Sequence, residues 1–211
     1  MTKQPYFIGI TGGSASGKSS FARDLKSFFT DEEMTVLNED NYYLPKDKVP
    51  VDVNGMQNYD TPEAIDRAAY IEHVRNLSSG IAIQKQEYTF HKPGVIPRLF
   101  TFYPAPLIIL EGLFSLRFDE VKNLVDLKLY IDADPAARYN RRIKRDIEER
   151  GLDQADVDYR WNNHITPSFE HDHNEYKSCA DLIILNNTNY QKGLDIIVAF
   201  LKDVLVRTNA L

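Results

Sequence analysis

The sequence predicts an α/β fold in which a mostly parallel sheet lies between two layers of helices. Short apolar runs alternate with segments of helical periodicity along the whole chain. One of these runs, 107–110, is continuously apolar, as strands buried on both faces are. The first run, 6–11, leads through a turn of small residues directly into a helical segment, which is the order of a β-turn-α unit.

That turn, GGSASGKS at residues 12–19, fits the pattern G-x-x-x-x-G-K-[ST] of a phosphate-binding loop. It stands between the strand 6–11 and a helical pattern over 20–29. Small residues allow successive backbone N–H groups to converge on phosphate oxygens, and the helix N-terminus adds partial positive charge. Lys18 is expected to bridge the β- and γ-phosphates and the Ser19 hydroxyl to contact Mg²⁺. An ordinary Gly-Ser turn is the alternative. The expected nucleotide ligands are Gly12, Gly13, Ser14, Ala15, Ser16, Gly17, Lys18, Ser19 and Ser20.

The remaining elements are predicted from periodicity and from turn residues. Further strands are expected at 34–37, 107–110, 127–132 and 182–185, with two or three short antiparallel strands within 81–102. Residues 44–60 carry prolines and little periodicity and are predicted as loop. A helix is expected to start at Thr61-Pro62-Glu63 and run to 77, and others at 135–150, 157–170 and 190–206.

Composition favours one globular domain and excludes several classes of function. The chain has 211 residues, 43% hydrophobic and 27% charged. Its net charge of −6 argues against nucleic acid as a main partner, because a phosphate backbone requires a basic face. No apolar run reaches the ~20 residues that span a bilayer, and the first residues show no signal-peptide pattern. The single cysteine, Cys179, cannot form an internal disulfide, which suits a reducing compartment. The expected location is the cytoplasm.

Three acidic residues stand at predicted strand ends, where open parallel sheets bind their ligands: Asp40, Glu111 and Asp132. Phosphoryl transfer needs Mg²⁺ near the loop and a group that orients the attacking oxygen. Asp40 is the candidate for accepting the hydroxyl proton, and Glu111 for a metal or metal-water contact. A turn or helix-cap carboxylate is the alternative for both. Asp132 is interpreted as a cap, because a helix that starts at a proline follows it.

The predicted helix 135–150 carries a dense group of arginines. Tyr139, Ile143 and Ile147 recur every four residues and are expected to form its buried stripe. The arginines are then expected largely off that stripe, crowded on one side, with only Asp146 close enough to relieve Arg142: Arg138, Arg141, Arg142 and Arg145. A solvated helix face is one interpretation; a lid that closes over a triphosphate is the favoured one. His164 is interpreted as a surface or packing residue.

Taken together, these segments resemble the uridine kinase (uridine–cytidine kinase) family of P-loop nucleoside kinases. The matching segments are in family order and cover nearly the whole chain: GITGGSASGKSS (9–20), DNYY (40–43), YDTPEA (59–64), YP (103–104), EG (111–112), DAD (132–134) and RRIKRDIEERG (141–151). The resemblance implies a P-loop NTPase fold with three α/β/α layers, an acceptor-binding edge insertion at about 44–104 and an arginine-rich lid at about 135–152.

The resemblance also implies an activity: transfer of the γ-phosphate of ATP or GTP to the 5′-hydroxyl of a ribonucleoside, with Mg²⁺. It implies pyrimidine salvage and a homotetramer. It makes Asp40 the catalytic base and places Ser19 and Glu111 at Mg²⁺. The residues implied at the nucleoside are Asp60, Tyr43, Tyr88 and Arg142, and those implied at the triphosphate from the lid are Arg145 and Arg150.

The sequence departs from the family at the base pocket. Thr89 stands where the family usually has aspartate, and Pro93 where it has a histidine that touches the pyrimidine; His91, two residues earlier, is the candidate replacement. Leu152 and Arg160 stand where an arginine and a base-reading glutamine are common. The choice of nucleoside therefore stays open.

Two alternatives to a nucleoside kinase remain. One is a kinase of another small alcohol, similar to phosphoribulokinase, pantothenate kinase or nicotinamide riboside kinase. The other is a nucleotide-binding switch, which is disfavoured because no Asn/Thr-Lys-x-Asp segment is present and because the 44–60 connection suits an acceptor site.

Overall fold

The computed structural model describes residues 4–90 and 94–209. Its centre is a parallel sheet of five strands in the order β2-β5-β1-β6-β7. Their bounds are Met34–Asn38 for β2, Leu107–Glu111 for β5, Tyr6–Thr11 for β1, Leu127–Asp132 for β6 and Leu182–Leu185 for β7. All neighbours in this sheet pair in parallel. The predicted parallel α/β fold is therefore confirmed.

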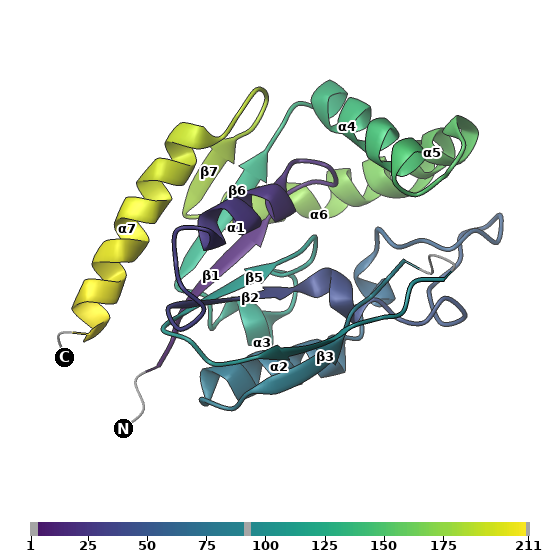
Figure 1. Ribbon diagram of the computed structural model, residues 1–211. Helices are drawn as coiled ribbons and strands as arrows, with labels where there is room; N and C mark the ends of the chain where they lie inside the picture. The colour runs from purple at the N-terminus through teal and green to yellow at the C-terminus, as the bar shows by residue number, and fades with distance from the viewer. Residues whose placement is uncertain (1–3, 91–93, 210–211) are drawn as a thin grey trace.

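Helices cover both faces of the sheet (Figure 1). On one face α1 (Lys18–Lys26) and α7 (Gln191–Asn209) pack on alternate residues of the strands, such as Ile8 and Ile109. On the other face α2 (Arg67–Ser78) and α3 (Asp119–Lys122) pack on Phe7 and Ile108. Because successive side chains of a strand point to opposite faces, one apolar run supplies both cores.

The helices that follow β6 lie at the carboxyl end of the sheet. They are α4 (Pro135–Glu148), α5 (Gln154–Arg160), a π-helical turn η3 (Trp161–Ile165) and α6 (Thr166–Cys179). In Figure 1, α4 and α5 project past the strand ends, beside the loop that joins β1 to α1. The described residues hold no helix long and apolar enough to cross a membrane.

Two predicted helix boundaries are wrong. Thr61-Pro62-Glu63 starts only the 3-10 turn η2 (Pro62–Ala64), because the chain becomes extended again at Ile65. Helix α2 begins at Arg67, where the Asp66 side chain accepts a hydrogen bond from the backbone N of Ala69 at 3.1 Å. The helix predicted over 157–170 begins earlier, since Asp153 caps α5 in the same way, and continues through η3 and α6. The short helix α3 was not predicted.

A small antiparallel sheet lies beside the main one. It pairs β3 (Ile83–Gln86) with β4 (Leu99–Phe102), as predicted for this region. Residues 44–60 form the predicted loop, with one isolated bridge between Val51 and Gln57. Glu39–Tyr42 forms the 3-10 turn η1 directly after β2.

Candidate active site

The loop between β1 and α1 is built around glycines that no other residue can replace. At Gly12 the backbone has φ +149°, and a Cβ atom there would lie 2.2 Å from the carbonyl oxygen of Ile131 in the neighbouring strand. Gly17 has φ +101°, and its Cβ would lie 2.3 Å from the Asn186 side chain. That amide instead donates to the backbone oxygen of Ser16 at 2.7 Å. The loop is therefore held in shape by β6 and by the segment after β7.

The polar groups of this loop are buried and suited to an anion. The Lys18 ammonium donates to the Gly13 carbonyl at 3.2 Å. Burial lowers the pKa of Lys18, while the carboxylates of Glu111 and Asp40 oppose this shift. Among the described residues the buried Ser16 hydroxyl has no hydrogen-bond partner. A buried cation and an unsatisfied donor next to a helix N-terminus fit a phosphate group.

Two of the predicted carboxylates meet at this loop. Asp40 follows β2 and Glu111 ends β5; these strands are neighbours, with Asn38 and Glu111 in register. The Ser19 hydroxyl donates to Glu111 at 3.2 Å. Burial raises the pKa of Glu111 to about 7. A hydroxyl beside a carboxylate fits Mg²⁺, which binds proteins through one or two such ligands together with substrate phosphates.

Asp40 is half-buried on the turn η1. The cap of that turn is the Asn38 side chain, which accepts a hydrogen bond from the backbone N of Asp40 at 2.8 Å. The Asp40 carboxylate is thus not the cap. Burial raises its pKa, although the positive charges of Lys18, Arg150 and Arg145 oppose this shift. A carboxylate whose pKa is moved toward neutrality suits proton transfer.

Glu39 is a buried acid that the sequence interpretation did not single out. Its Oε2 atom accepts a hydrogen bond from the backbone N of Phe114 at 2.8 Å, and burial raises its pKa well above the usual range. A Cβ atom on Gly112 would collide with it. The sequence feature that could have indicated Glu39 is its place in the acidic pair Glu39-Asp40, which directly follows a predicted strand.

The third carboxylate was misinterpreted. Asp132 does not cap the helix α4; its Oδ2 atom forms an ion pair with Lys177 of α6 at 2.5 Å. Asp134 stands at the N-cap position. Because Asp132 is the last residue of β6, its side chain reaches the helix that covers this strand.

The predicted buried stripe of α4 is also wrong. Its buried residues are Arg138, Arg142 and Asp146, whereas Ile147 is 38% exposed. This helix packs on the phosphate-binding loop instead of on an apolar sheet face. Its buried side chains are therefore polar ones that find partners in or beside that loop. Arg142 donates through Nη1 to the Ser14 hydroxyl at 2.7 Å.

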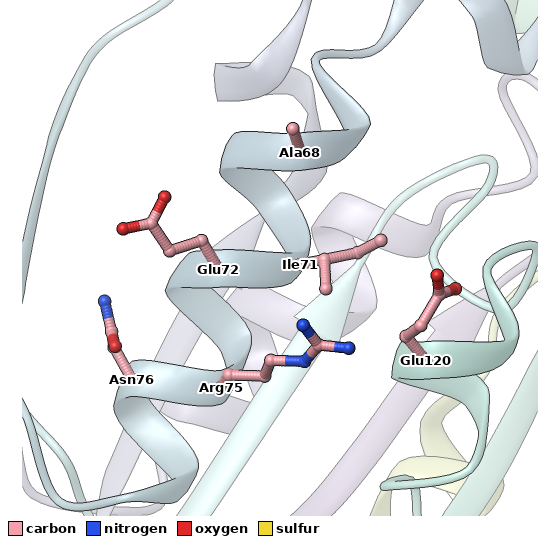
Figure 2. Close-up of a pocket in the computed structure, with 6 residues that line it drawn as sticks. All are labelled: Ala68, Ile71, Glu72, Arg75, Asn76 and Glu120. Carbon is pink, nitrogen blue, oxygen red and sulfur yellow. The ribbon is translucent and has the colours of Figure 1, made fainter.

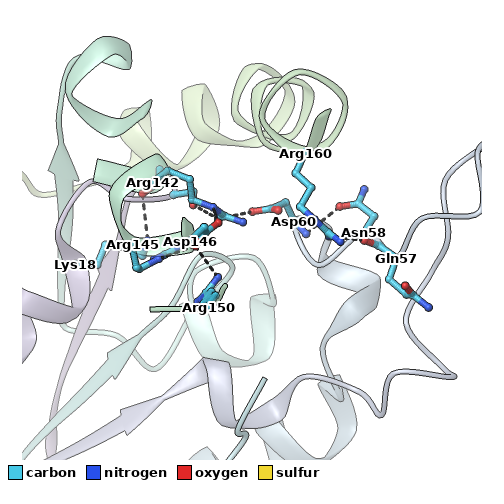
Figure 3. Close-up of polar contacts among 11 residues, drawn as sticks. Lys18, Gln57, Asn58, Asp60, Arg142, Arg145, Asp146, Arg150 and Arg160 are labelled. Atoms are coloured by element: carbon cyan, nitrogen blue, oxygen red, sulfur yellow. Dashed lines mark hydrogen bonds and ion pairs between the residues drawn. The ribbon is translucent and has the colours of Figure 1, made fainter. Parts of the chain in front are cut away.

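Asp146 pairs with Arg142 and Arg145 of this helix and with Arg150 just beyond its end, as Figure 3 shows. Its fully buried carboxylate accepts hydrogen bonds from Arg142 and, at 3.0 Å, from Arg145; Arg150 lies 3.2 Å away. Burial by itself would raise the pKa of Asp146, but the three guanidinium groups lower it overall. The expected contact of Asp146 with Arg142 is present. Near neutral pH the cluster keeps excess positive charge beside Lys18.

Arg138 is separate from this cluster. Its guanidinium lies over the Phe169 ring at 3.8 Å and over Trp161 at 5.5 Å, and burial lowers its pKa. A Cβ atom on Gly13 would lie 2.3 Å from its Nη1 atom. Arg138 therefore supports the loop from outside rather than joining the other arginines.

On the other side of Asp40, aromatic residues and Asp60 form a second subsite. The ring centroid of Tyr43 lies 5.4 Å from that of Tyr59 and 5.3 Å from that of Tyr88. The Arg150 guanidinium lies over the Phe90 ring, 4.4 Å from its centroid. The Tyr88 backbone N donates to the Asn41 side chain at 3.1 Å. The sequence interpretation missed Tyr59 and Phe90.

Asp60 is buried, 3.9 Å from Nη1 of Arg142. Arg160 donates to the backbone oxygen of Gln57 at 3.1 Å, beside Asp60 in Figure 3. The candidate His91, and Pro93 at the usual histidine position, lie outside the described residues. The predicted site residues within the described part of the chain thus fall into two groups, one at the 12–19 loop and one around Tyr43 and Asp60. The charges of Lys18 in the first group and Asp60 in the second both act on Asp40.

A pocket of about 370 Å³ lies elsewhere, between α2 and α3. Figure 2 shows Arg75 of α2 extending toward Glu120 of α3, with Glu72 pointing away. Its polar residues are largely exposed, and it lies away from the carboxyl ends of the strands. It takes no part in the candidate site.

Comparison with known proteins agrees with this geometry. A family model described as the phosphoribulokinase / uridine kinase family matches residues 7–190. A uridine kinase from Clostridium perfringens is 35% identical over 207 residues, covering 96% of this chain and 98% of the relative. A uridine kinase from Brevibacillus brevis is 34% identical over 202 residues, covering 96% and 94%. The solved phosphoribulokinase from Rhodobacter spheroides matches with a TM-score of 0.62 at 16% identity, covering 88% of this chain and 71% of that one, which shows the shared fold. This chain is a phosphotransferase that belongs to the phosphoribulokinase / uridine kinase family.

Proposed function

We propose that this enzyme transfers the γ-phosphoryl group of ATP, or of GTP, to the 5′-hydroxyl of a ribonucleoside, with uridine and cytidine as the acceptors. The observation that carries the proposal is the position of Asp40. The charges of Lys18 on the phosphate side and Asp60 on the acceptor side both act on its carboxylate. These opposing charges support Asp40 as the group that acts between donor and acceptor.

On the donor side, the backbone N–H groups of residues 12–19 and the Lys18 ammonium bind the phosphate chain. The Gly13–Lys18 hydrogen bond gives way, and Lys18 turns to the β- and γ-phosphates. Ser19 and Glu111 hold Mg²⁺, which when bound neutralises developing charge on the phosphate oxygens. Arg145 and Arg150 add positive charge from the lid.

On the acceptor side, the aromatic residues Tyr43 and Tyr88 contact the base, while Asp60 and Arg142 bind the sugar. Asp40 takes the proton from the 5′-hydroxyl as its oxygen forms a bond to the γ-phosphorus. The bond between that phosphorus and the β–γ bridging oxygen breaks, and ADP leaves. Because Arg142 also contacts Ser14 of the loop, it aligns the two subsites.

The functional units of this proposal are an acceptor-binding insertion at about 44–104 and a lid at about 135–152. The resemblance to uridine kinases supports a homotetramer that works in cytoplasmic pyrimidine salvage. His91 is proposed as a further base contact, since it falls two residues from the usual histidine position and would share its strand face.

A second acceptor class, another small alcohol, is favoured by Thr89 and Arg160. At Arg160 a guanidinium stands beside the acceptor side where a base-reading glutamine is common, and its Nε atom is buried without a hydrogen-bond partner among the described residues. An acceptor with a carbonyl or anionic group would satisfy that donor.

A ligand panel distinguishes these functions. Ligands that bind the folded state raise the melting temperature by mass action. Stabilisation by uridine or cytidine, together with ATP consumption in their presence, supports the proposal. A response to another alcohol alone favours the second acceptor class. A response to GTP and GDP without any acceptor favours a switch.

A further inference from the structure

A tight hairpin precedes the acceptor carboxylate Asp60. Residues 51–57 fold back on themselves: Asp52 N donates to the Met56 oxygen at 2.9 Å, and Gly55 at the turn has φ +77°. Oδ1 of Asp52 accepts hydrogen bonds from the backbone N of Asn54 and of Met56, each at 2.9 Å. One oxygen of Asp52 thus holds its own hairpin closed.

The other oxygen of Asp52 reaches a distant segment. Oδ2 accepts hydrogen bonds from the Tyr159 hydroxyl at 2.7 Å and from Nε2 of His164 at 2.8 Å. Asn54 donates to the same Tyr159 oxygen at 2.6 Å. Tyr159 belongs to α5 and His164 to η3. These four residues, which we call the latch, connect positions more than a hundred residues apart.

The latch includes a buried histidine, which distinguishes it from an incidental surface contact. His164 is 2% exposed, and its Nδ1 atom has no hydrogen-bond partner among the described residues, so Asp52 provides the partner of the ring. The π-helical turn brings His164 around to the hairpin, and such turns occur often at functional sites. The bonds from Tyr159 and His164 lower the pKa of Asp52, which keeps its carboxylate ionised.

Both ends of the latch lie next to the candidate site. At the base of the hairpin, the backbone N of Asn58 donates to the Pro50 oxygen at 2.8 Å. The Asn58 side chain in turn accepts from the backbone N of Asp60 at 2.9 Å, which links the base of the hairpin to Asp60. On the other end, α5 follows the lid residue Arg150 after a short connection. Arg160, next to Tyr159, adds a parallel bond to Gln57. Any shift of α5 against the hairpin therefore moves the lid against the acceptor site.

We propose that Asp52 is a positioning residue that locks the acceptor hairpin to the lid, so that Asp60 and the lid arginines hold one productive arrangement. Its effect on turnover rests on the proposed function, since it concerns the acceptor side of that reaction. The mechanical coupling between the hairpin and the lid rests only on the contacts of the hairpin with α5 and η3, and it is measured separately.

The kinetic test uses Asp52→Asn and Tyr159→Phe in the full chain. Asp52→Asn keeps the shape of the side chain but turns an amide N–H toward the donors Tyr159 and His164. Tyr159→Phe removes one hydrogen bond to Asp52 without changing the charge. The control is Asp47→Asn, an exposed aspartate of the same loop. We expect Asp52→Asn to lower kcat/KM for the nucleoside by roughly 10- to 100-fold, the cost of a small misplacement, while KM for ATP stays within about twofold.

The mechanical test needs no turnover. Trp161, the one tryptophan of the chain, lies in η3 between Tyr159 and His164, and its fluorescence reports on that turn. Hydrogen exchange at 51–57 reports on the hairpin. In Asp52→Asn we expect faster exchange at 51–57 and at 159–165 together, and a shifted Trp161 emission. Asp47→Asn should match the wild type in both.

The outcomes separate the two proposals. Wild-type protein that phosphorylates no nucleoside overturns the proposed function, while coupled exchange of 51–57 and 159–165 still supports the latch. Unchanged exchange at 159–165 in Asp52→Asn overturns the latch. So does an equal loss toward nucleoside and ATP in both variants, because that is the result of a merely structural role.

Discussion

The buried carboxylate of Asp146 accepts a hydrogen bond from the guanidinium of Arg142, one turn earlier in the same helix. The other arm of Arg142 donates to Ser14 in the phosphate-binding loop. The ion pair within the helix thus holds the guanidinium of Arg142, and the bond from Arg142 to Ser14 fixes the lid helix to the loop that is proposed to hold the donor. The same guanidinium lies 3.9 Å from Asp60 on the acceptor side.

Removing the charge of Asp146 should destabilise the protein. In Asp146→Asn three guanidinium groups lose their common anion, and loss of one partner of a buried ion pair costs about 3–5 kcal/mol. Thermal and urea unfolding measure the loss against Glu149→Gln, an exposed residue at the end of the same helix. Equal melting temperatures for the two variants would show that the cluster contributes nothing to stability.

Asp40→Asn should fold normally and lose activity. Without a proton acceptor beside the attacking hydroxyl, kcat should fall by about 10²- to 10⁴-fold, the usual contribution of a positioned base. The melting temperature should not fall below that of the wild type, because Asn38, not Asp40, caps the turn and because burial already raises the pKa of Asp40. A variant with wild-type kcat would make Asp40 a structural residue.

Arg145→Ala should impair catalysis more than nucleoside binding. Arg145 lies on the phosphate side, 3.0 Å from Asp146, and acts on the charges of Lys18 and Asp40. Loss of an interaction made mainly in the transition state lowers kcat, with little change in nucleoside KM. Steady-state kinetics with each substrate varied provide the measurement. An unchanged kcat with a raised nucleoside KM would argue against the lid role.

The raised pKa of Glu39 predicts that the stability of the protein depends on pH. Its folded pKa is raised above the ordinary 4.5, so its contribution is complete below that value and is lost as pH rises through the folded pKa. Glu39→Gln keeps an acceptor for the Phe114 N–H and carries no charge at any pH. The melting temperature of this variant should therefore rise relative to that of the wild type as the pH is raised from 5 to 8.

Melting curves of both proteins across that pH range decide this point. A constant difference between them would mean that Glu39 titrates alike in the folded and unfolded chains. A falling difference would mean that its folded pKa is lowered.

The strands and the phosphate-binding loop could be predicted from sequence, because local patterns determine them. An apolar run such as 107–110 has few alternatives to a buried strand, and Gly12 and Gly17 occupy backbone conformations that favour glycine. The carboxylates Asp40 and Glu111 also followed from the rule that parallel strands bind ligands at their carboxyl ends.

The errors fall where long-range contacts override local patterns. The stripe of Tyr139, Ile143 and Ile147 suits a helix on an apolar sheet, but α4 packs on a polar loop and buries arginines instead. A proline soon after Asp132 predicts that this residue caps a helix, whereas its actual partner, Lys177, is 45 residues away. His164 is buried, as expected of a packing residue, but nothing near it in sequence indicates Asp52 as its hydrogen-bond partner.

The central claim is that a phosphoryl group passes from a nucleotide in the 12–19 loop to the 5′-oxygen of a ribonucleoside. ³¹P NMR of a reaction with Mg·ATP and each of a panel of ribonucleosides measures this directly. The account predicts a 5′-monophosphate resonance with uridine or cytidine, formed together with ADP, and its loss in Asp40→Asn. ADP release without any nucleoside monophosphate, across the full panel, would contradict it.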